Sequence, residues 1–448
     1  MIDKRLDSDD IENKNSNKLI VLLYTLVFMM VFEGVVRKIL PSINIAIFLL
    51  KDLLCIIGLY LVITSNEDKR ISAFKLGIRI LSYLFIPIFM VTVLYEPAIA
   101  IFGIKQYLLY ISVAFMFCYA FGSHNKSAFN TFVYVFTLLL IPTTGVAVLQ
   151  STLPASHWLN SSVSGESMEA FSVDGVLRVC STFSFTGQYS FYLNAAGAFL
   201  GLRIFIVEKK FLGSVFDGIL VGILVLSLII GCFITGGRTA VLGLGLSSII
   251  ALLLITYKQP KLVFQKVWIW AIAGFLLFGA IRTALPQFFE AYEKRQKDDE
   301  ETNELETRLI NSFLEESEWV ADLSFVQVLM GQGIGVMSNG SEKISSYSLE
   351  KRTGGFWTEN DFQSTLWEGG LYLVAVWYGF RFFIIIFCIS KWARLTHRPY
   401  LIGGAFLVGF ITVSGVVSLL GIQNTIAIWW WCGVGAFLCI TLLDKKNT

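Results

Sequence analysis

The sequence predicts an all-α protein: a polytopic membrane helix bundle of about twelve transmembrane helices with a large, partly helical extracytoplasmic loop. Three observations carry this prediction. Hydrophobic residues make up 55% of the 448 residues and charged residues only 15%, against about 25% charged residues in soluble domains. The mean hydropathy is +0.68. The apolar residues are gathered into runs of about 20, the length that crosses a bilayer as a helix.

Twelve such runs follow one another along the chain. The predicted spans are residues 19–36, 43–64, 77–95, 98–120, 129–149, 186–207, 213–234, 239–256, 265–286, 362–388, 400–420 and 424–443. They divide the chain into a cytoplasmic tail (1–18), transmembrane helices one to nine (19–286), a large extracytoplasmic loop (287–361), transmembrane helices ten to twelve (362–443) and a second cytoplasmic tail (444–448).

The distribution of lysine and arginine predicts the orientation. With both termini in the cytoplasm, every inner connection is short and basic, as the positive-inside rule requires. The two long connections, 150–185 and 287–361, then lie outside, and the first of them carries one basic residue, Arg178. The first outer turn is an exception, because it carries Arg37 and Lys38. The seven cysteines show no paired spacing, and the six other than Cys180 lie in apolar runs and are interpreted as packing residues. Cys180 is expected to be reachable from outside if its loop is open.

The large loop divides into two parts by composition. Its first part, from Phe288 to Leu323, mixes strong helix formers with apolar residues at helical spacing and predicts helix. The second part contains "GQGIG" (331–335), which lacks the spacing and the strand-helix context of a dinucleotide site. A backbone turn that approaches a ligand or another helix is the expected role.

Several polar residues interrupt the apolar pattern. Lys51 and Asp52 are adjacent in the second span, so their side chains diverge by about 100° and require different partners. Two roles remain as alternatives for this pair: a structural polar contact, or a site for a proton or an ion. The turn "TGGR" places Arg238 at the outer membrane boundary. Such an arginine either snorkels to lipid headgroups or marks a site.

The other outer arginines favour a phosphate site. Arg37, Arg178, Arg282 and Arg308 fall on or near the same predicted side as Arg238. A guanidinium binds phosphate oxygens with two parallel hydrogen bonds, so several arginines around one cavity suit a diphosphate. On the outside of a membrane, a lipid-linked sugar carrier is such a diphosphate. The alternative is pairing with the many carboxylates of 287–361, which is favoured for the run 293–301.

Other classes of function find no support. The net charge of +2 gives no electrostatic basis for binding nucleic acid. The three histidines, His124, His157 and His397, form no metal-binding pattern with cysteines or carboxylates. We therefore expect neither a metal nor another cofactor.

The order of motifs resembles the O-antigen polymerase and ligase superfamily of Wzy-type polymerases and their ligase relatives. The matching pieces are "EGVVRKILP", "LRVCSTFSFTGQYSFYLNAAGAFL", "TGGRTAVLGLGLSSIIALLL", "VLMGQGIGV" in a large outer loop and "TENDFQSTLWEGGLYLVAVWYGF". The ligase branch typically has a histidine near the end of the large loop. Here the corresponding pair is Glu359-Asn360, which favours a polymerase.

The resemblance implies a metal-independent glycosyltransferase of the bacterial cytoplasmic membrane. Its donor would be an undecaprenyl-diphosphate-linked oligosaccharide and its acceptor a lipid-linked repeat unit. Membrane lipids, a chain-length regulator and a flippase would be its partners. An oligosaccharide ligase and a twelve-helix transporter are the alternatives.

The same resemblance suggests roles for particular residues. Arg178, Arg238 and Arg308 would bind the diphosphate and stabilise the negative charge of the leaving group, and Arg238 is the one of the three expected to be catalytic. Glu359 would activate the acceptor hydroxyl, although its position also suits the charge or capping chemistry of a helix start. The second-rank candidates are Arg37, Arg282, Arg352 and Gln363.

Overall fold

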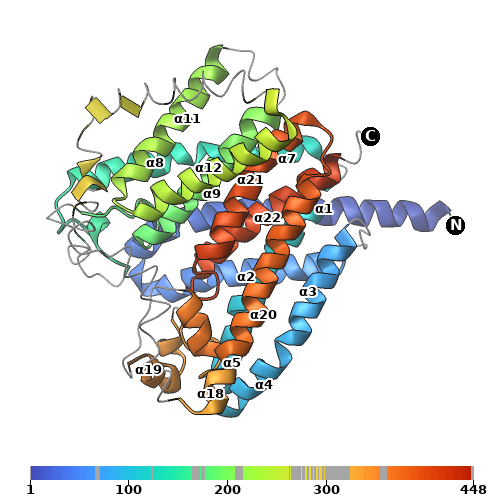
Figure 1. Cartoon of the computed structure of the whole chain (residues 1–448), viewed down its shortest axis with the longest axis vertical. Coiled ribbons are helices and arrows are strands. Elements are labelled where there is room, and N and C mark those ends of the chain that lie inside the picture. Colours follow the sequence, from blue (N-terminus) through green and yellow to red (C-terminus); the bar gives the residue numbers. More distant parts are fainter. Residues whose placement is uncertain are drawn as a thin grey trace.

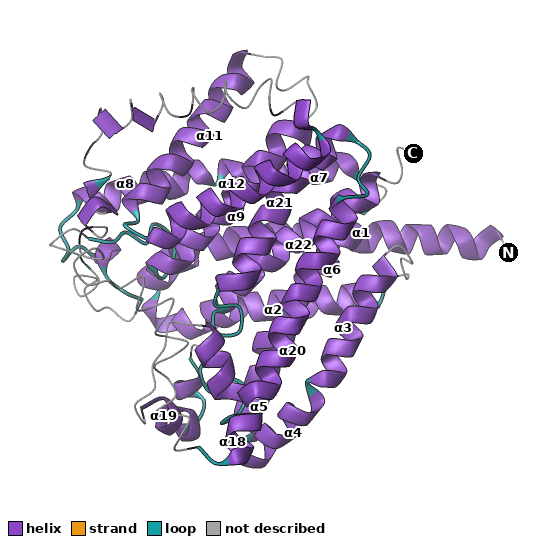
Figure 2. Ribbon diagram, viewed as in Figure 1, coloured by secondary structure: helices purple, strands orange, loops and turns teal. Residues whose placement is uncertain are grey.

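The chain forms an all-helical membrane bundle, which is shown in Figure 1 and coloured by secondary structure in Figure 2. This computed structural model describes residues 2–65, 71–122, 125–163, 172, 177–206, 215–261, 323–338, 340–353 and 361–444, with isolated positions between 263 and 297. Within these residues there is no β-strand, and eleven helical spans are long and apolar enough to cross a membrane.

Eight of these spans are assigned as single helices. They are α1 (Ile2–Ile39), α2 (Asn44–Ile63), α9 (Thr186–Ile206), α11 (Val215–Ile234), α12 (Arg238–Lys258), α20 (Asp361–Trp392), α21 (Arg398–Val417) and α22 (Asn424–Asp444). Each of the other three is built from two consecutive helices. These are α3 (Ser72–Leu84) with α4 (Ile86–Tyr95), α5 (Pro97–Ile104) with α6 (Ile111–Phe121), and α7 (Lys126–Leu138) with α8 (Leu140–Thr152).

Short elements complete the described structure. A turn of π-helix, Lys105–Leu109, joins α5 to α6. Single 3-10 turns lie at Pro41–Ile43, Trp158–Asn160 and Ser341–Lys343. The large loop contributes two short helices, α18 (Phe325–Met330) and α19 (Ser346–Thr353).

The predicted fold class is confirmed, and eleven of the twelve predicted spans coincide with helices. The ninth predicted span, 265–286, lies outside the described residues except for isolated positions, as does most of the helical part predicted for the large loop. Helix α1 begins at Ile2, so the predicted N-terminal tail continues the first span as helix and projects from the bundle in Figure 1.

Helix α22 lies at the centre of the bundle. It packs against α6, α9, α20 and α21, and 94% of its most apolar window is buried, against 22% for the α3–α4 span. A helix that is apolar on all sides is expected to be enclosed by other helices. Its three consecutive tryptophans, Trp429, Trp430 and Trp431, are all almost fully buried. The peripheral spans instead leave apolar side chains facing outward, where a membrane would cover them.

Helix α20 differs from its predicted form, because it folds back on itself. At Gly370 the backbone has φ 60° and ψ −162°, which is not helical. Asp361 forms an ion pair with Arg381, and the rings of Phe362 and Tyr378 lie 5.6 Å apart. In a straight helix, residues 361 and 381 would be about 30 Å apart. The segment 361–369 therefore runs back beside the segment that follows Gly370.

Candidate functional site

The C-terminal turn of α1 carries the first element of the site. Arg37 Nη1 donates hydrogen bonds to Glu33 Oε1 at 2.9 Å and to Ser184 Oγ at 3.3 Å, and Nε donates to Asn44 Oδ1. Gly34 allows the segment before α9 to cross α1, because an added Cβ would lie 2.0 Å from the carbonyl carbon of Phe183. The motif "EGVVRK" thus places a guanidinium against the segment that leads into α9.

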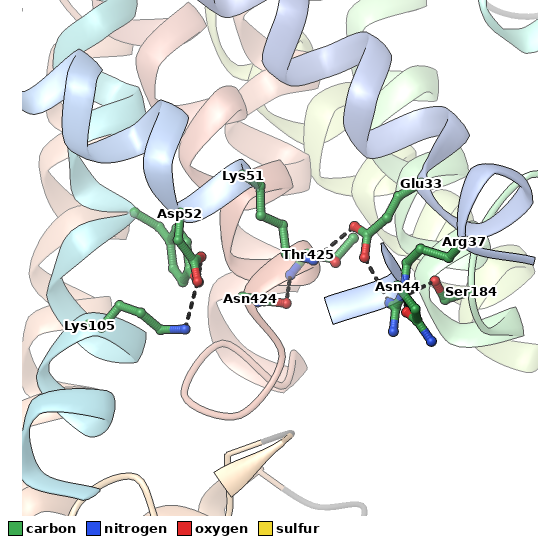
Figure 3. A network of polar contacts seen from close by, with 10 residues as sticks. Glu33, Arg37, Asn44, Lys51, Asp52, Lys105, Ser184, Asn424 and Thr425 are labelled. Atoms are coloured by element: carbon green, nitrogen blue, oxygen red, sulfur yellow. Dashed lines mark hydrogen bonds and ion pairs between the residues drawn. The ribbon is translucent and has the colours of Figure 1, made fainter. Parts of the chain in front are cut away.

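Lys51 and Asp52 find separate partners, as their different directions on α2 require. Lys51 Nζ donates to Glu33 Oε2 at 2.8 Å. Asp52 accepts from Lys105 Nζ at 2.8 Å and from the hydroxyl of Tyr110 at 2.6 Å. Figure 3 shows these groups beside the first residues of α22. We call Glu33, Arg37, Lys51, Asp52 and Lys105 the α1–α2 polar cluster.

The α1–α2 polar cluster has an excess of positive charge. It contains three cationic and two anionic side chains, which leaves one net positive charge. Burial of an uncompensated charge is costly, so an anion at this place would be stabilised. Arg37 and Lys105 retain 14% and 17% exposure of their side chains, so both are within reach of a ligand.

Two buried neutral polar groups lie close to the cluster, one along the chain and one in space. Gln106 follows Lys105 in the π-helical turn, and Thr425 lies in the first turn of α22 beside Lys51 in Figure 3. Gln106 Nε2 and Thr425 Oγ1 have no hydrogen-bond partner among the described residues. Buried polar groups are normally satisfied, so these two atoms have capacity to bind a ligand or water.

The segments that carry two further predicted arginines contact the first half of α9. Thr186 Oγ1 donates to the backbone oxygen of Arg178 at 3.3 Å. On the next turns of α9, Asn194 Nδ2 donates to the backbone oxygen of Thr239, the residue that follows Arg238. Segments that carry Arg37, Arg178 and Arg238 therefore all contact residues 184–194. The structure brings the segments that carry these three residues to the first half of α9 and the residues just before it.

The glycines and the threonine of "TGGR" form the turn that positions Arg238. Gly236 has φ 60°, a value that a residue with a side chain rarely adopts. Thr235 Oγ1 accepts a hydrogen bond from the backbone N–H of Gly237 at 3.0 Å. Arg238 is the first residue of α12, and its side chain is half-buried rather than extended into solvent.

The remaining predicted residues fall in different environments. Arg282 is 58% exposed and pairs with Glu293 at 2.7 Å, so the carboxylate-pairing alternative holds for this residue. Gln363 is buried in the first segment of α20. Arg352 belongs to α19, but its side chain lies outside the described part of the chain. Arg308 and Glu359 also lie outside it.

The turn "GQGIG" binds the folded-back part of α20. The backbone N–H groups of Gln332 and Gly333 donate to the carbonyl oxygens of Trp367 and Glu368, each at 2.8 Å. The Glu368 carboxylate accepts from the N–H of Met337 and from the hydroxyl of Tyr107, each at 2.7 Å. The turn therefore approaches a helix, one of the two alternatives that the sequence left open.

Glu368 was missed by the sequence interpretation. It is completely buried and joins the large loop to the π-helical turn through Met337 and Tyr107. The signal was present in the sequence: a carboxylate within the tenth apolar run, directly before two glycines.

Nearby, burial raises the pKa of Tyr347 to about 12, so at neutral pH its hydroxyl stays protonated and donates to Gln332 O at 2.7 Å.

The cysteines are free, as the sequence indicated, and all seven are buried. Cys180 is only 2% exposed, and its sulfur accepts weak hydrogen bonds from Lys38 Nζ and Gln150 Nε2 at 3.4 and 3.5 Å. The condition for its labelling, an open loop, is therefore not met.

No protein-family model and no curated protein matches the chain. Its structure establishes a multi-pass membrane protein. Any more specific function depends on the geometry of the site and on the resemblance of its motifs.

Proposed function

We propose that this protein is a polysaccharide polymerase of the bacterial cytoplasmic membrane, with both termini in the cytoplasm. It transfers a glycan from an undecaprenyl-diphosphate-linked donor to a lipid-linked repeat-unit acceptor on the outer face of the membrane. A chain-length regulator and a flippase are the partners that such a reaction requires, because the chain must be terminated and the repeat unit must be delivered across the membrane.

One observation carries the proposal: segments with Arg37, Arg178 and Arg238 contact residues 184–194, which lead into α9 and form its first half, and Arg37 belongs to a polar cluster with a net positive charge. Arginine suits the bidentate recognition of phosphate. A diphosphate bound there would be held at the end of the bundle where its lipid tail can remain in the membrane. Charge that develops on the leaving diphosphate would be stabilised by groups already in place.

The acceptor hydroxyl needs a base, and we assign this role to Glu359. Asp361, the nearest alternative along the chain, is occupied in the structure. Its carboxylate accepts from Arg381 and from the backbone N–H of Gly421 at 3.1 Å, and it is 3% exposed. A carboxylate that is already bonded on both oxygens and almost fully enclosed is not accessible to a substrate hydroxyl. His157 is a further alternative, with Nδ1 accepting from the N–H of Leu159.

The test is polymer formation by purified protein on lipid-linked repeat units. Arg238→Lys keeps the positive charge but removes the planar guanidinium, which can make two parallel hydrogen bonds to phosphate. Arg282→Lys is the matched control, because Arg282 is exposed and paired with a surface carboxylate. We expect the first variant to lose most activity and the second to keep it. Equal activity of both variants at matched folding would contradict phosphate binding by Arg238.

A ligase would use the same donor chemistry with a different acceptor. A transporter is the second candidate function, and two observations favour it. Helix α20 is interrupted at Gly370, and buried ion pairs join α1 to α2 and the two segments of α20. Interrupted helices and intramembrane charges are typical of transporter sites. An assay in detergent solution distinguishes the two functions. A polymerase lengthens its substrate there, whereas a transporter forms no covalent product and has no second compartment into which it could move a substrate.

A further inference from the structure

A groove of about 590 Å³ runs along the outside of the bundle between α3 and α20. Its α20 wall is one helical face, which extends from Gly379 to Lys391 with residues three and four positions apart, and Arg394 follows just beyond the end of the helix. The middle of this face consists of phenylalanine and isoleucine side chains. Ala73, near the start of α3, forms the opposite side. The groove lies far from the α1–α2 polar cluster along α20, toward the end that carries Lys391.

The dimensions of the groove match one leaflet of a bilayer. The segment of α20 after Gly370 has enough residues to span the hydrocarbon core by itself. From Gly379 to Lys391 the helix rises about 18 Å, and one half of a bilayer core is about 15 Å thick. The groove therefore extends from near the membrane centre to one membrane boundary.

The groove is open on its outer side, and its base is formed by a close contact between α3 and α20. A Cβ atom added at Gly379 would meet no atom within 4 Å, whereas one added at Gly77 would lie 2.5 Å from the ring of Phe383. Helix α3 thus approaches α20 closely at Gly77, and Phe383 closes the gap between them. The side chains of Phe382 and Ile386 are 49% and 62% exposed along the groove.

The groove ends in positive charge. Lys391 and Arg394 line its boundary end. The Lys391 ammonium lies 5.4 Å from the centre of the Phe387 ring, so its aliphatic stem follows the apolar wall. Basic residues next to a membrane helix attract anionic lipid headgroups.

We propose that this groove binds one acyl chain of an anionic phospholipid, whose headgroup phosphate is held by Lys391 and Arg394. A transmembrane partner helix is the less suitable occupant, because it gives no reason for two cations at the groove's end. The proposal goes beyond the glycosyl transfer proposed above and does not depend on it.

The experiment measures lipid binding to the purified full-length protein by native mass spectrometry. Phosphatidylglycerol and phosphatidylcholine with the same acyl chains are the two probes. The first variant, Lys391→Gln with Arg394→Gln, removes charge at the membrane boundary. The second, Gly379→Leu, fills the open part of the groove. Arg398→Gln is the control, because Arg398 is exposed at the same end but does not line the groove.

We expect the unmodified protein to retain one phosphatidylglycerol in preference to phosphatidylcholine. Each basic residue contributes about a fivefold change in affinity, so the double variant should lose roughly 25-fold. Gly379→Leu should weaken both lipids, and Arg398→Gln should change neither. The proposal is overturned if Arg398→Gln costs as much as the double variant, if the double variant keeps its preference, or if Gly379→Leu instead dissociates a dimer of this chain.

Discussion

Replacing Gly370 by alanine tests the folded-back geometry of α20. At Gly370 the backbone has φ 60° and ψ −162°, a conformation that costs an alanine about 1–3 kcal/mol. The added Cβ would also lie 2.4 Å from the backbone carbon of Leu329, so α18 would have to move. Overpacking of this kind adds about 1–3 kcal/mol. The expected destabilisation is therefore about 2–6 kcal/mol.

Gly379→Ala is the matched control on the same helix. Gly379 has helical geometry with open space around its Cα, so alanine there should gain about 0.5–1 kcal/mol from its helix propensity. The two glycine-to-alanine changes, nine positions apart, should differ by at least about 2.5 kcal/mol.

Thermal unfolding in detergent and limited trypsin digestion provide the measurements. Because the turn 331–337 is anchored on the residues just before Gly370, loss of the bend should release the loop. The backbone next to Lys343 and Lys351 should then enter the active site of trypsin more readily. We expect faster cleavage and a lower melting temperature for Gly370→Ala alone. If both variants melt and digest alike, α20 is not folded back at this residue, and the argument fails.

Three further outcomes are expected. Glu359→Gln should reduce turnover by about 10²–10⁴-fold with donor binding kept, whereas near-normal turnover would mean that Glu359 acts only at a helix start, where a charge contributes about 0.3–1 kcal/mol. Cys180 should resist an impermeant thiol reagent in the folded protein and react after unfolding, and fast native labelling would contradict its burial. A tag at Lys126 should be reachable only from the cytoplasm, and its exposure on intact cells would reverse the proposed topology.

Part of the candidate site was visible in the sequence. Arg37, Arg178 and Arg238 stood out as basic residues on the side where short segments usually lack them, and the structure brings their segments together at α9. Arg282 stood out for the same reason, yet it is paired with Glu293 on an exposed surface. The position of an arginine in the sequence indicates its depth in the membrane. Its partner depends on which segments are its neighbours in the folded bundle.

Glu368 shows the same limit, because the residue can be seen in the sequence but its partners cannot. A single carboxylate in an apolar run could be seen in the sequence, but its partners come from residues 107 and 337, which are far away along the chain. No local pattern links these positions. They meet because the bend at Gly370 presents Glu368 to both the large loop and the π-helical turn.

The sequence by itself determined the membrane class, the order of the spans and the end of each span that carries basic residues. These properties are sums over consecutive residues, because the transfer of a helix into lipid depends mainly on the apolar surface of that helix. The tertiary structure decided which helix is central, how α20 folds back, and how Lys51 and Asp52 are paired with Glu33 and Lys105. A buried charge is stabilised by whichever partner packs within a few ångströms of it, and that neighbour is chosen by the packing of the whole bundle.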